Sequence, residues 1–167
     1  SFVEDAGFYW AHRITHENKF MYKFHKIHHE YTEVFSIVTE YTHPVDYIFG
    51  NLVLLILLSY LQQSPLPVGK SGSLFHVFLL ASMENTVSTE GHCGYYFPWS
   101  PTRIFLFVSD PSFHDYHHSK NVGNYCGSIY LWDYFNGSSE SYFKHFYGVN
   151  LLKKLNEKKI KELRIDL

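Results

Sequence analysis

The chain has 167 residues and a formal net charge of −2, and aromatic residues (19%) outnumber charged ones (18%). This length predicts a single domain over residues 1–167. The net charge gives no electrostatic support to nucleic-acid binding. Cys93 and Cys126 are too few for a disulfide framework and form no C-x-x-C pair, which favours a reducing, cytosol-facing compartment. The many aromatic and few charged residues suit a protein that contacts lipid.

The first histidine motif lies near the start of the chain, in a segment expected to be helical over about residues 3–16. Asp5 near its beginning, where a carboxylate suits the helix dipole, favours a helix start there. His12 and His16 stand four residues apart, so a helix places both imidazoles on one face. One such pair is weak evidence, because the chain contains 12 histidines.

Two further motifs repeat the spacing H-x-x-H-H, one within an expected helix from Phe20 to Glu30 and one in FHDYHH. Neutral imidazole is a strong ligand for iron, zinc, copper and nickel. Eight converging imidazoles are more than one tetrahedral ion can use, so the repetition predicts a site for two octahedral ions. The candidate ligands in the three motifs are His12, His16, His25, His28, His29, His114, His117 and His118.

Two apolar segments separate the second and third motifs. Tyr47–Leu61 is almost unbroken in its apolar character, but as a helix it covers only about 22 Å of a hydrocarbon core of roughly 30 Å. After a turn rich in proline and glycine, Leu74–Met83 is apolar again. We expect a helical hairpin over about residues 47–83 that enters a membrane and returns. A buried hairpin in a soluble bundle is the alternative.

Two segments have the composition of membrane–water interfaces. The run Tyr95-Tyr96-Phe97 with Trp99 is typical of an interfacial aromatic belt and could also line a substrate cleft. Residues 151–167 are expected to form an amphipathic, lysine-rich helix. Its basic face could contact anionic lipid or an acidic partner, and a merely solvated helix is the alternative.

The motifs H-R-x-x-H from His12, H-K-x-H-H from His25 and H-D-x-H-H from His114, with HCGYYFPWS from His92, carry a family resemblance. They resemble the fatty acid hydroxylase / sterol desaturase superfamily of membrane di-iron oxygenases. The resemblance runs from about Glu4 to about Gly137 and is greatest to 4-methyl sterol oxidases, although cholesterol side-chain hydroxylases share the GY-x-FPWS stretch.

The resemblance implies an all-α integral membrane protein with a di-metal site at its cytosolic face. It adds His92 to the ligand set and two iron ions as the metals, with zinc as a substitute in a purified sample. His43, which directly precedes Pro44, is a further candidate, either as a ligand or as a hydrogen-bond partner of one. Asp115 and either Glu84 or Glu90 are expected to accept the outer N–H of ligating imidazoles. Trp132-Asp133 is interpreted as a helix cap.

The implied activity is O₂-dependent hydroxylation of an apolar lipid, with a sterol methyl or alkyl group as the first choice. Neither G-x-G-x-x-G nor a P-loop occurs in the sequence. Electrons are therefore expected from NAD(P)H through a reductase and a b-type cytochrome. The implied location is the endoplasmic reticulum membrane, with another intracellular membrane as the alternative.

Two other functions fit the same motifs. One is a sterol desaturase, or an enzyme that hydroxylates or removes a side-chain alkyl group. The other is a non-catalytic structural subunit of a larger membrane complex. Members of the resembled family usually carry additional membrane helices before the first motif. We therefore expect either a shortened N-terminus or partners that supply that part of the membrane surface.

Overall fold

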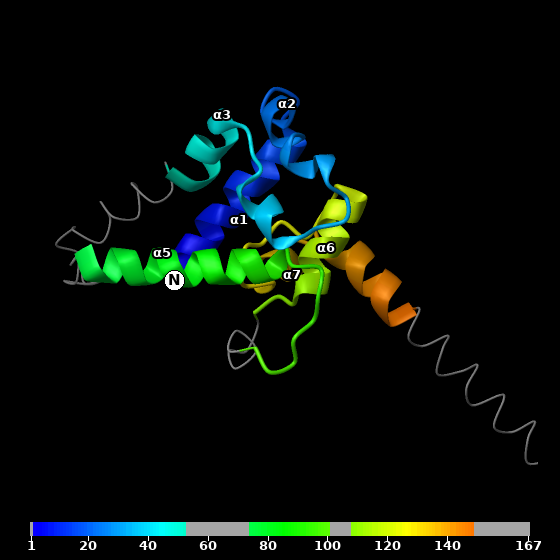
Figure 1. The fold of residues 1–167 in the computed structure, drawn as a ribbon. Coiled ribbons are helices and arrows are strands. Elements are labelled where there is room, and N and C mark those ends of the chain that lie inside the picture. The colour runs from blue at the N-terminus through cyan, green and yellow to red at the C-terminus, as the bar shows by residue number, and fades with distance from the viewer. Residues whose placement is uncertain (1, 53–73, 101–107, 149–167) are drawn as a thin grey trace, which may run out of the picture.

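The computed structural model describes residues 2–52, 74–100 and 108–148 (Figure 1). In these segments the regular structure is helical, apart from one isolated bridge between Val108 and Ile129, so the expected all-α class is confirmed for them. A further helical stretch covers residues 140–148. The named elements are α1 (Phe2–Glu17), α2 (Tyr22–His25), η1 (His28–Glu30), η2 (Ser36–Glu40), α3 (Pro44–Tyr47), η3 (Ile48–Leu52), α5 (Leu74–Gly91), α6 (Pro111–Lys120) and α7 (Leu131–Phe135).

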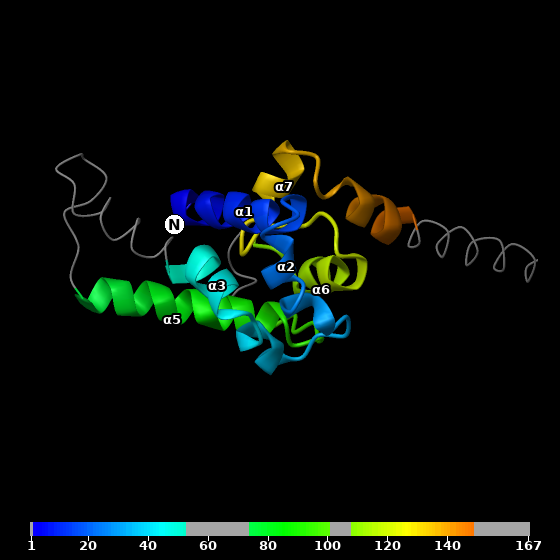
Figure 2. The same cartoon turned by 90° about the horizontal axis from the view of Figure 1, so that it is seen from above.

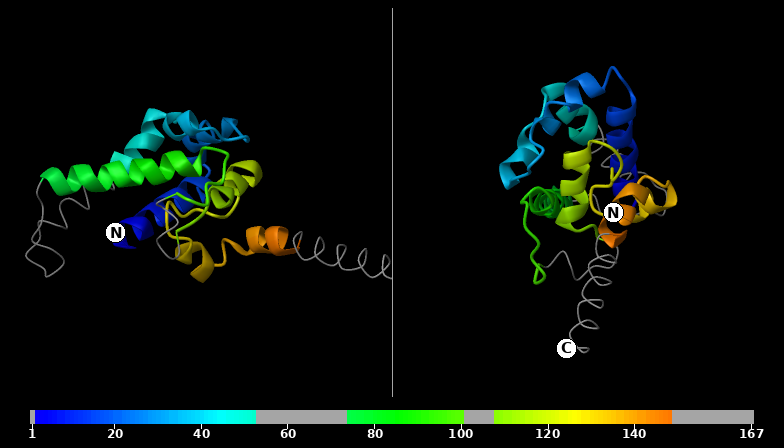
Figure 3. Two further views of the ribbon diagram at one scale, coloured as in Figure 1. Left: turned by 60° about the horizontal axis from the view of Figure 1, so that its bottom comes forward. Right: turned by 90° about the vertical axis from the view of Figure 1, so that its right-hand side faces the viewer.

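The longest helices, α1 and α5, run along opposite sides of the bundle in the view of Figure 2, with α2, α3 and α6 between them. Helix α1 contacts α2 and η3, while α5 contacts η2 and α6. Figure 3 shows the segment 140–148 at the edge of the bundle, away from α5. The three histidine motifs lie on α1, on α2 with η1, and on α6. This arrangement directs all three motifs towards the interior.

Helix α6 carries the third motif, and its ends follow from the sequence. Asp110 is the N-cap and accepts the backbone N–H of Phe113, and Pro111 occupies the first turn. Both are standard signals of a helix start, and a cap of this kind contributes about 1 kcal/mol. The helix ends at Asn121, whose φ of 57° is left-handed. Asparagine tolerates this conformation better than most residues, so the local sequence limits the helix to the turns around the motif.

The second motif departs from the expected single helix over Phe20–Glu30. The α-helix ends at His25, and His28–Glu30 forms a 3₁₀ turn instead. Across this break, Ile27 N–H donates to Phe24 O (3.3 Å) and Glu30 N–H to Ile27 O (3.2 Å). Hydrogen bonds between residues three apart, as in a 3₁₀-helix, wind the backbone more tightly than the bonds of an α-helix, which join residues four apart. The side chains of this motif therefore do not all lie on one helical face.

The apolar core is small and lies beside the histidines. It consists of Tyr9, Phe113, Tyr125, Cys126 and Tyr142. Many of the other buried side chains in the described segments are polar, and six of these are histidines. Polar groups are costly to bury unless they are hydrogen-bonded or bind an ion. The interior of this fold is therefore organised around its polar groups as much as around its apolar ones.

The expected hairpin over residues 47–83 is described only at its ends. Tyr47 ends α3, and residues 53–73 lie outside the described segments. Leu74–Met83 forms the first part of α5, which continues without a break to Gly91. In the part of the chain that the structure describes, no helix combines the length and the apolarity needed to cross a membrane. The expected basic helix over residues 151–167 also lies outside the described segments.

Candidate metal centre

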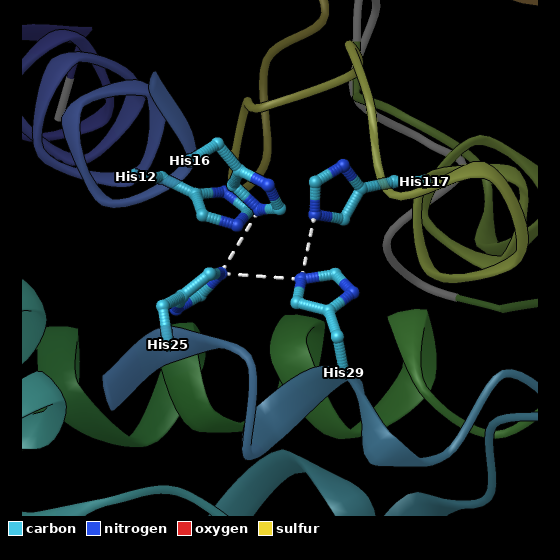
Figure 4. A group of neighbouring side chains, drawn as sticks. All are labelled: His12, His16, His25, His29 and His117. Atoms are coloured by element: carbon cyan, nitrogen blue, oxygen red, sulfur yellow. Dashed lines mark hydrogen bonds between the residues drawn. The ribbon is translucent and has the colours of Figure 1, made fainter. Parts of the chain in front are cut away.

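Nine of the predicted site histidines converge in two adjacent groups. Within each group, one nitrogen from every ring lies within 4.8 Å of the others. Figure 4 shows the first group, with rings from α1, from the second motif and from α6 directed at a common centre. The five-histidine group contains His12, His16, His25, His29 and His117, and the four-histidine group contains His28, His92, His114 and His118.

Each H-x-x-H-H motif is divided between the two groups in the same way. The first and last histidines of the motif belong to one group, whereas the middle histidine, at the fourth position of the motif, belongs to the other group. His25 and His29 belong to the five-histidine group and His28 to the four-histidine group, while the third motif reverses this assignment. In the third motif, which lies within one α-helix, successive residues point about 100° apart, but residues four apart point only about 40° apart. One short segment can therefore supply nitrogens to two centres.

The facing atoms within each group are the Nε2 nitrogens. In the five-histidine group, Nε2 of His25 lies 3.0 Å from Nε2 of His16 and 3.1 Å from that of His29. In the four-histidine group, Nε2 of His92 lies 2.9 Å from that of His114 and 3.2 Å from that of His118. The Nε2 atoms of His28 and His92 are 3.3 Å apart.

In six of the nine histidines the opposite ring nitrogen, Nδ1, lies within hydrogen-bond distance of an oxygen acceptor, whereas Nδ1 of His16 and Nδ1 of His29 are buried without a hydrogen-bond partner in the described segments. Five of these acceptors are main-chain carbonyls, which cannot donate, so the five Nδ1 atoms must carry the proton. A neutral imidazole with its proton on Nδ1 has an unprotonated Nε2. The contacts are His12 with Tyr125 O (2.8 Å), His117 with Gly123 O (2.5 Å), His28 with Tyr41 O (3.1 Å), His92 with Ser88 O (2.8 Å) and His118 with Tyr31 O (3.2 Å).

The four-histidine group consequently holds unprotonated nitrogens that face one another. His28, His92 and His118 each donate through Nδ1, so their close Nε2 contacts are not hydrogen bonds between neutral rings. Lone pairs at this distance repel, and a cation between them would turn repulsion into attraction. At a metal–nitrogen distance of about 2.1 Å, neighbouring ligands are about 3.0 Å apart around an octahedral ion and about 3.4 Å around a tetrahedral one. The observed separations fit a transition-metal ion.

Protonation of the rings does not remove this repulsion near neutral pH. Burial lowers the pKa of His28 to about 3, with a further decrease from neighbouring His92. Burial likewise lowers the pKa of His92 to about 4, although the hydrogen bond to Ser88 O acts in the opposite direction. The pKa values of His12, His114 and His117 also lie well below the usual value, because these rings are buried among other histidines. Neutral rings are the form that binds metal.

A carboxylate that the sequence analysis missed orients His25. Asp46 is 7% exposed, and its Oδ2 accepts from His25 Nδ1 at 2.8 Å and from Thr42 Oγ1 at 2.8 Å. Burial raises the pKa of Asp46, but the hydrogen bond and the charge of His25 outweigh it and lower the pKa overall. The available signal was Pro44 with an acidic residue two positions later, a pattern typical of a helix start.

The sequence profile of the family described as "Fatty acid hydroxylase" matches residues 1–138. This chain belongs to the fatty acid hydroxylase family. The match includes all nine converging histidines.

Several curated relatives are similar to this fatty acid hydroxylase family member. A Dictyostelium discoideum protein, named provisionally as a methylsterol monooxygenase, is 36% identical over 84% of this chain and 50% of its own length. Methylsterol monooxygenase 2-2 of Arabidopsis thaliana is 33% identical over the same shares. A very-long-chain aldehyde decarbonylase of Oryza sativa subsp. indica is also 33% identical over these shares. The chain thus spans about half the length of these relatives. No solved structure matches.

His43 lies outside both histidine groups of this fatty acid hydroxylase family chain. It is the N-cap residue of α3, and its Nδ1 accepts the backbone N–H of Val45 at 3.1 Å. Its ring packs against Phe24, with the ring centres 4.9 Å apart. The structure therefore gives His43 a role at a helix start.

Three expectations about carboxylates need correction. No hydrogen bond joins Asp115 to a histidine in the described segments, and partial burial and the charge of Glu33 raise its pKa. The Nδ1–H of His92 goes to Ser88 O and not to Glu84 or Glu90. Asp133 does not cap α7, because it accepts the backbone N–H groups of the preceding loop. Main-chain carbonyls, and not the expected carboxylates, accept from five of the nine Nδ1 atoms, and four of these carbonyls lie in loops.

The aromatic run after His92 lies largely at the surface. Tyr95 is 71% and Trp99 is 79% exposed. Phe97 and Trp99 line a cavity of about 610 Å³, but its other walls are mostly polar side chains of α5 and nearby loops, and no histidine lines it. In the described segments, these aromatic side chains therefore do not form an apolar cleft that reaches the histidines.

Proposed function

We propose that this chain belongs to a membrane lipid oxygenase that holds two iron ions in its two histidine groups. The observation that carries the proposal is the set of unprotonated Nε2 atoms facing one another at about 3 Å in the four-histidine group. The five-histidine and four-histidine groups would hold one ion each. Bound iron would supply the O₂ chemistry needed to oxidise an unactivated C–H bond, which acid–base side chains cannot perform.

The protein's own residues would tune this centre by orientation and by charge. Main-chain carbonyls and Asp46 fix the proton on Nδ1, so that Nε2 stays available inside. A ligand set of neutral imidazoles leaves the positive charge of the ions uncompensated, unlike the carboxylate-rich sites of soluble four-helix di-iron proteins. The four-histidine group supplies one nitrogen fewer, and we place the open position for an outside ligand there.

The favoured substrate is a methylated sterol, supported by relatives named methylsterol monooxygenase. A very-long-chain aldehyde is the second candidate, because an aldehyde decarbonylase is 33% identical over the same share of the chain. The same ligands could also serve desaturation or side-chain hydroxylation. Electrons would come from NAD(P)H through a reductase and a b-type cytochrome, and the site would face the cytosol at the endoplasmic reticulum.

Metal analysis of the purified protein tests the centre directly. We expect two transition-metal ions per chain, iron in the active form and zinc as a substitute in some preparations. His28→Ala and His117→Ala should each lose about one equivalent, because each removes a nitrogen from a different group. His43→Ala is the matched control and should keep both ions. Less than one equivalent in the folded wild-type protein would refute the proposal.

Deletion of the gene followed by joint profiling of sterols, aldehydes and fatty acids tests the substrate. Accumulated 4-methyl sterols would support the first candidate, and accumulated very-long-chain aldehydes the second. A rise in a saturated or side-chain-alkylated sterol would indicate desaturation or side-chain oxidation. Unchanged lipids together with loss of a membrane complex would indicate a structural subunit.

Membrane attachment is tested separately by carbonate extraction of cell membranes. The hairpin expected over residues 47–83 predicts that the chain stays in the pellet. Complete release into the supernatant would support the soluble-bundle alternative.

A further inference from the structure

One loop, residues 123–129, provides the outer hydrogen-bond acceptors for two members of the five-histidine group. Tyr125 O accepts from His12 Nδ1 at 2.8 Å, and Gly123 O accepts from His117 Nδ1 at 2.5 Å. The orientation of these two rings therefore depends on how firmly the loop backbone is held. The loop has left-handed φ angles at Gly123 (71°) and Asn124 (56°), a conformation that glycine and asparagine tolerate better than other residues.

The carboxylate of Asp133 anchors the middle of this loop by hydrogen bonds to its backbone. Its side chain is completely buried, and it accepts from Tyr125 N through Oδ1 (2.8 Å) and from Cys126 N through Oδ2 (2.7 Å). Ser138 Oγ donates to Oδ1 at 2.6 Å and fixes the carboxylate from the other side. Both oxygens thus face N–H or O–H donors, an arrangement suited to an ionised carboxylate.

Tyr125 C=O and Cys126 N–H are the two ends of one peptide unit. His12 donates to the oxygen of this unit, and the nitrogen donates to Asp133. Hydrogen bonds in such a chain polarise one another, so a carboxylate at one end makes the carbonyl oxygen at the other end a better acceptor. Asp46 accepts a hydrogen bond directly from His25. Asp133 and His12 are linked in a similar way, but with one peptide group between the carboxylate and the imidazole.

We propose that Asp133 is a positioning residue for the five-histidine group, acting on His12 through the peptide unit between Tyr125 and Cys126. The inference rests on the proposed metal-binding function and extends it to a residue outside the ligand set. Through this peptide, Asp133 fixes the plane of the His12 ring, keeps its proton on Nδ1 and increases the basicity of Nε2.

Asp5 offers a matched comparison, because it anchors the same loop without serving a histidine. It is 8% exposed, and its Oδ1 accepts from Ser128 N (2.8 Å) and Ile129 N (3.1 Å). The carbonyl of Ser128 accepts from Ser109 N at 2.6 Å. A residue that only anchors the loop should behave like Asp5, whereas a positioning residue should also change metal binding.

Asp133→Asn and Asp5→Asn are to be compared with wild type as full-length, zinc-loaded proteins. Asparagine keeps the shape of the side chain but replaces one acceptor with a donor and removes the charge. In Asp133→Asn, we expect about tenfold weaker binding of one zinc equivalent in competition with a chromophoric chelator. We also expect an upfield shift of the His12 Nδ1 proton in histidine-selective NMR. In Asp5→Asn, zinc affinity should stay within about twofold of wild type and the His12 proton should not move.

The outcomes separate this inference from the proposed function. Wild-type protein that binds no zinc would refute the proposed metal site itself. Wild-type protein that binds two equivalents, with Asp133→Asn equal to Asp5→Asn in both readouts, would overturn the role of Asp133 and leave the metal site standing. If Asp133→Asn does not fold, Ser138→Ala replaces it, because it removes one donor that fixes the carboxylate. We then expect a smaller decrease in affinity with the same His12 shift, and unchanged values would overturn the inference.

Discussion

The Oδ2 atom of Asp46 lies 2.8 Å from Nδ1 of His25, and both side chains are buried. Through this hydrogen bond, a carboxylate directly orients one member of the five-histidine group. Thr42 Oγ1 donates a hydrogen bond to the same oxygen, and this second bond restricts the carboxylate to its orientation. Because α3 begins just before Asp46, the position of this carboxylate depends on the helix start at Pro44.

Asp46→Asn is therefore expected to weaken metal binding by about 10- to 100-fold, because the ring of His25 loses a charged acceptor. Metal affinity is measured by chelator competition, with metal content determined after gel filtration. Asp115→Asn is the matched control, since Asp115 lies inside the third motif but has no hydrogen bond to a histidine in the described segments. Equal effects of both changes would contradict the role assigned to Asp46.

Stability should fall as the pH decreases below about 6.5. The folded-state pKa values of His28 (about 3) and His92 (about 4) lie below the unfolded value of 6.5, so between these values the unfolded chain binds more protons. In this window each of the two histidines lowers the free energy of unfolding by up to about 1.4 kcal/mol per pH unit of acidification. Urea unfolding at pH 5, 6 and 7 measures this dependence. Stability that rises on acidification over this range would refute it.

Metal removal should destabilise the fold, because it leaves unprotonated Nε2 atoms facing one another. At a free-metal concentration of 100 times Kd, a bound ion contributes about 2.7 kcal/mol to the free energy of unfolding. Calorimetry before and after dialysis against a chelator should show a lower Tm that zinc restores. Calcium, which prefers oxygen ligands, should not restore it. An unchanged Tm after complete metal removal would contradict the site.

Gly123→Ala should be far more disruptive than Gly137→Ala, although both glycines have φ near 70°. An added Cβ at Gly123 would lie 2.3 Å from Ser138 O, whereas at Gly137 it would meet nothing within 4 Å. Backbone strain alone costs about 1–2 kcal/mol at Gly137, and overpacking brings the cost at Gly123 to about 2–5 kcal/mol.

Thermal unfolding measures both glycine variants. Gly123→Ala should also lose metal from the five-histidine group, because Gly123 O accepts from His117. Equal stability of the two variants would show that the loop moves aside at Ser138.

The spacing of the sequence by itself predicted helices for the three histidine motifs and eight of the nine histidines that the structure brings together, and the family resemblance added the all-α class. Helical periodicity fixes the relative directions of residues within one or two turns, so the pairs His12/His16 and His114/His118 follow from spacing alone. His92 belongs to no motif of its own, and only the family resemblance selected it.

Spacing could not show which of the two groups each part of an H-x-x-H-H motif joins, because that depends on where the other helices lie. It also could not find the 3₁₀ turn that ends the second-motif helix at His25. Only the tertiary structure identified Asp46 and the carbonyls of Tyr125 and Gly123 as outer contacts of the histidines, and Asp133 as the anchor of the loop that carries these two carbonyls. Every residue carries a carbonyl oxygen, so the sequence does not mark which one will accept a histidine proton. Folding makes that selection when it places one loop carbonyl within hydrogen-bond distance of a ring more than a hundred residues away, as it does for Tyr125 and His12.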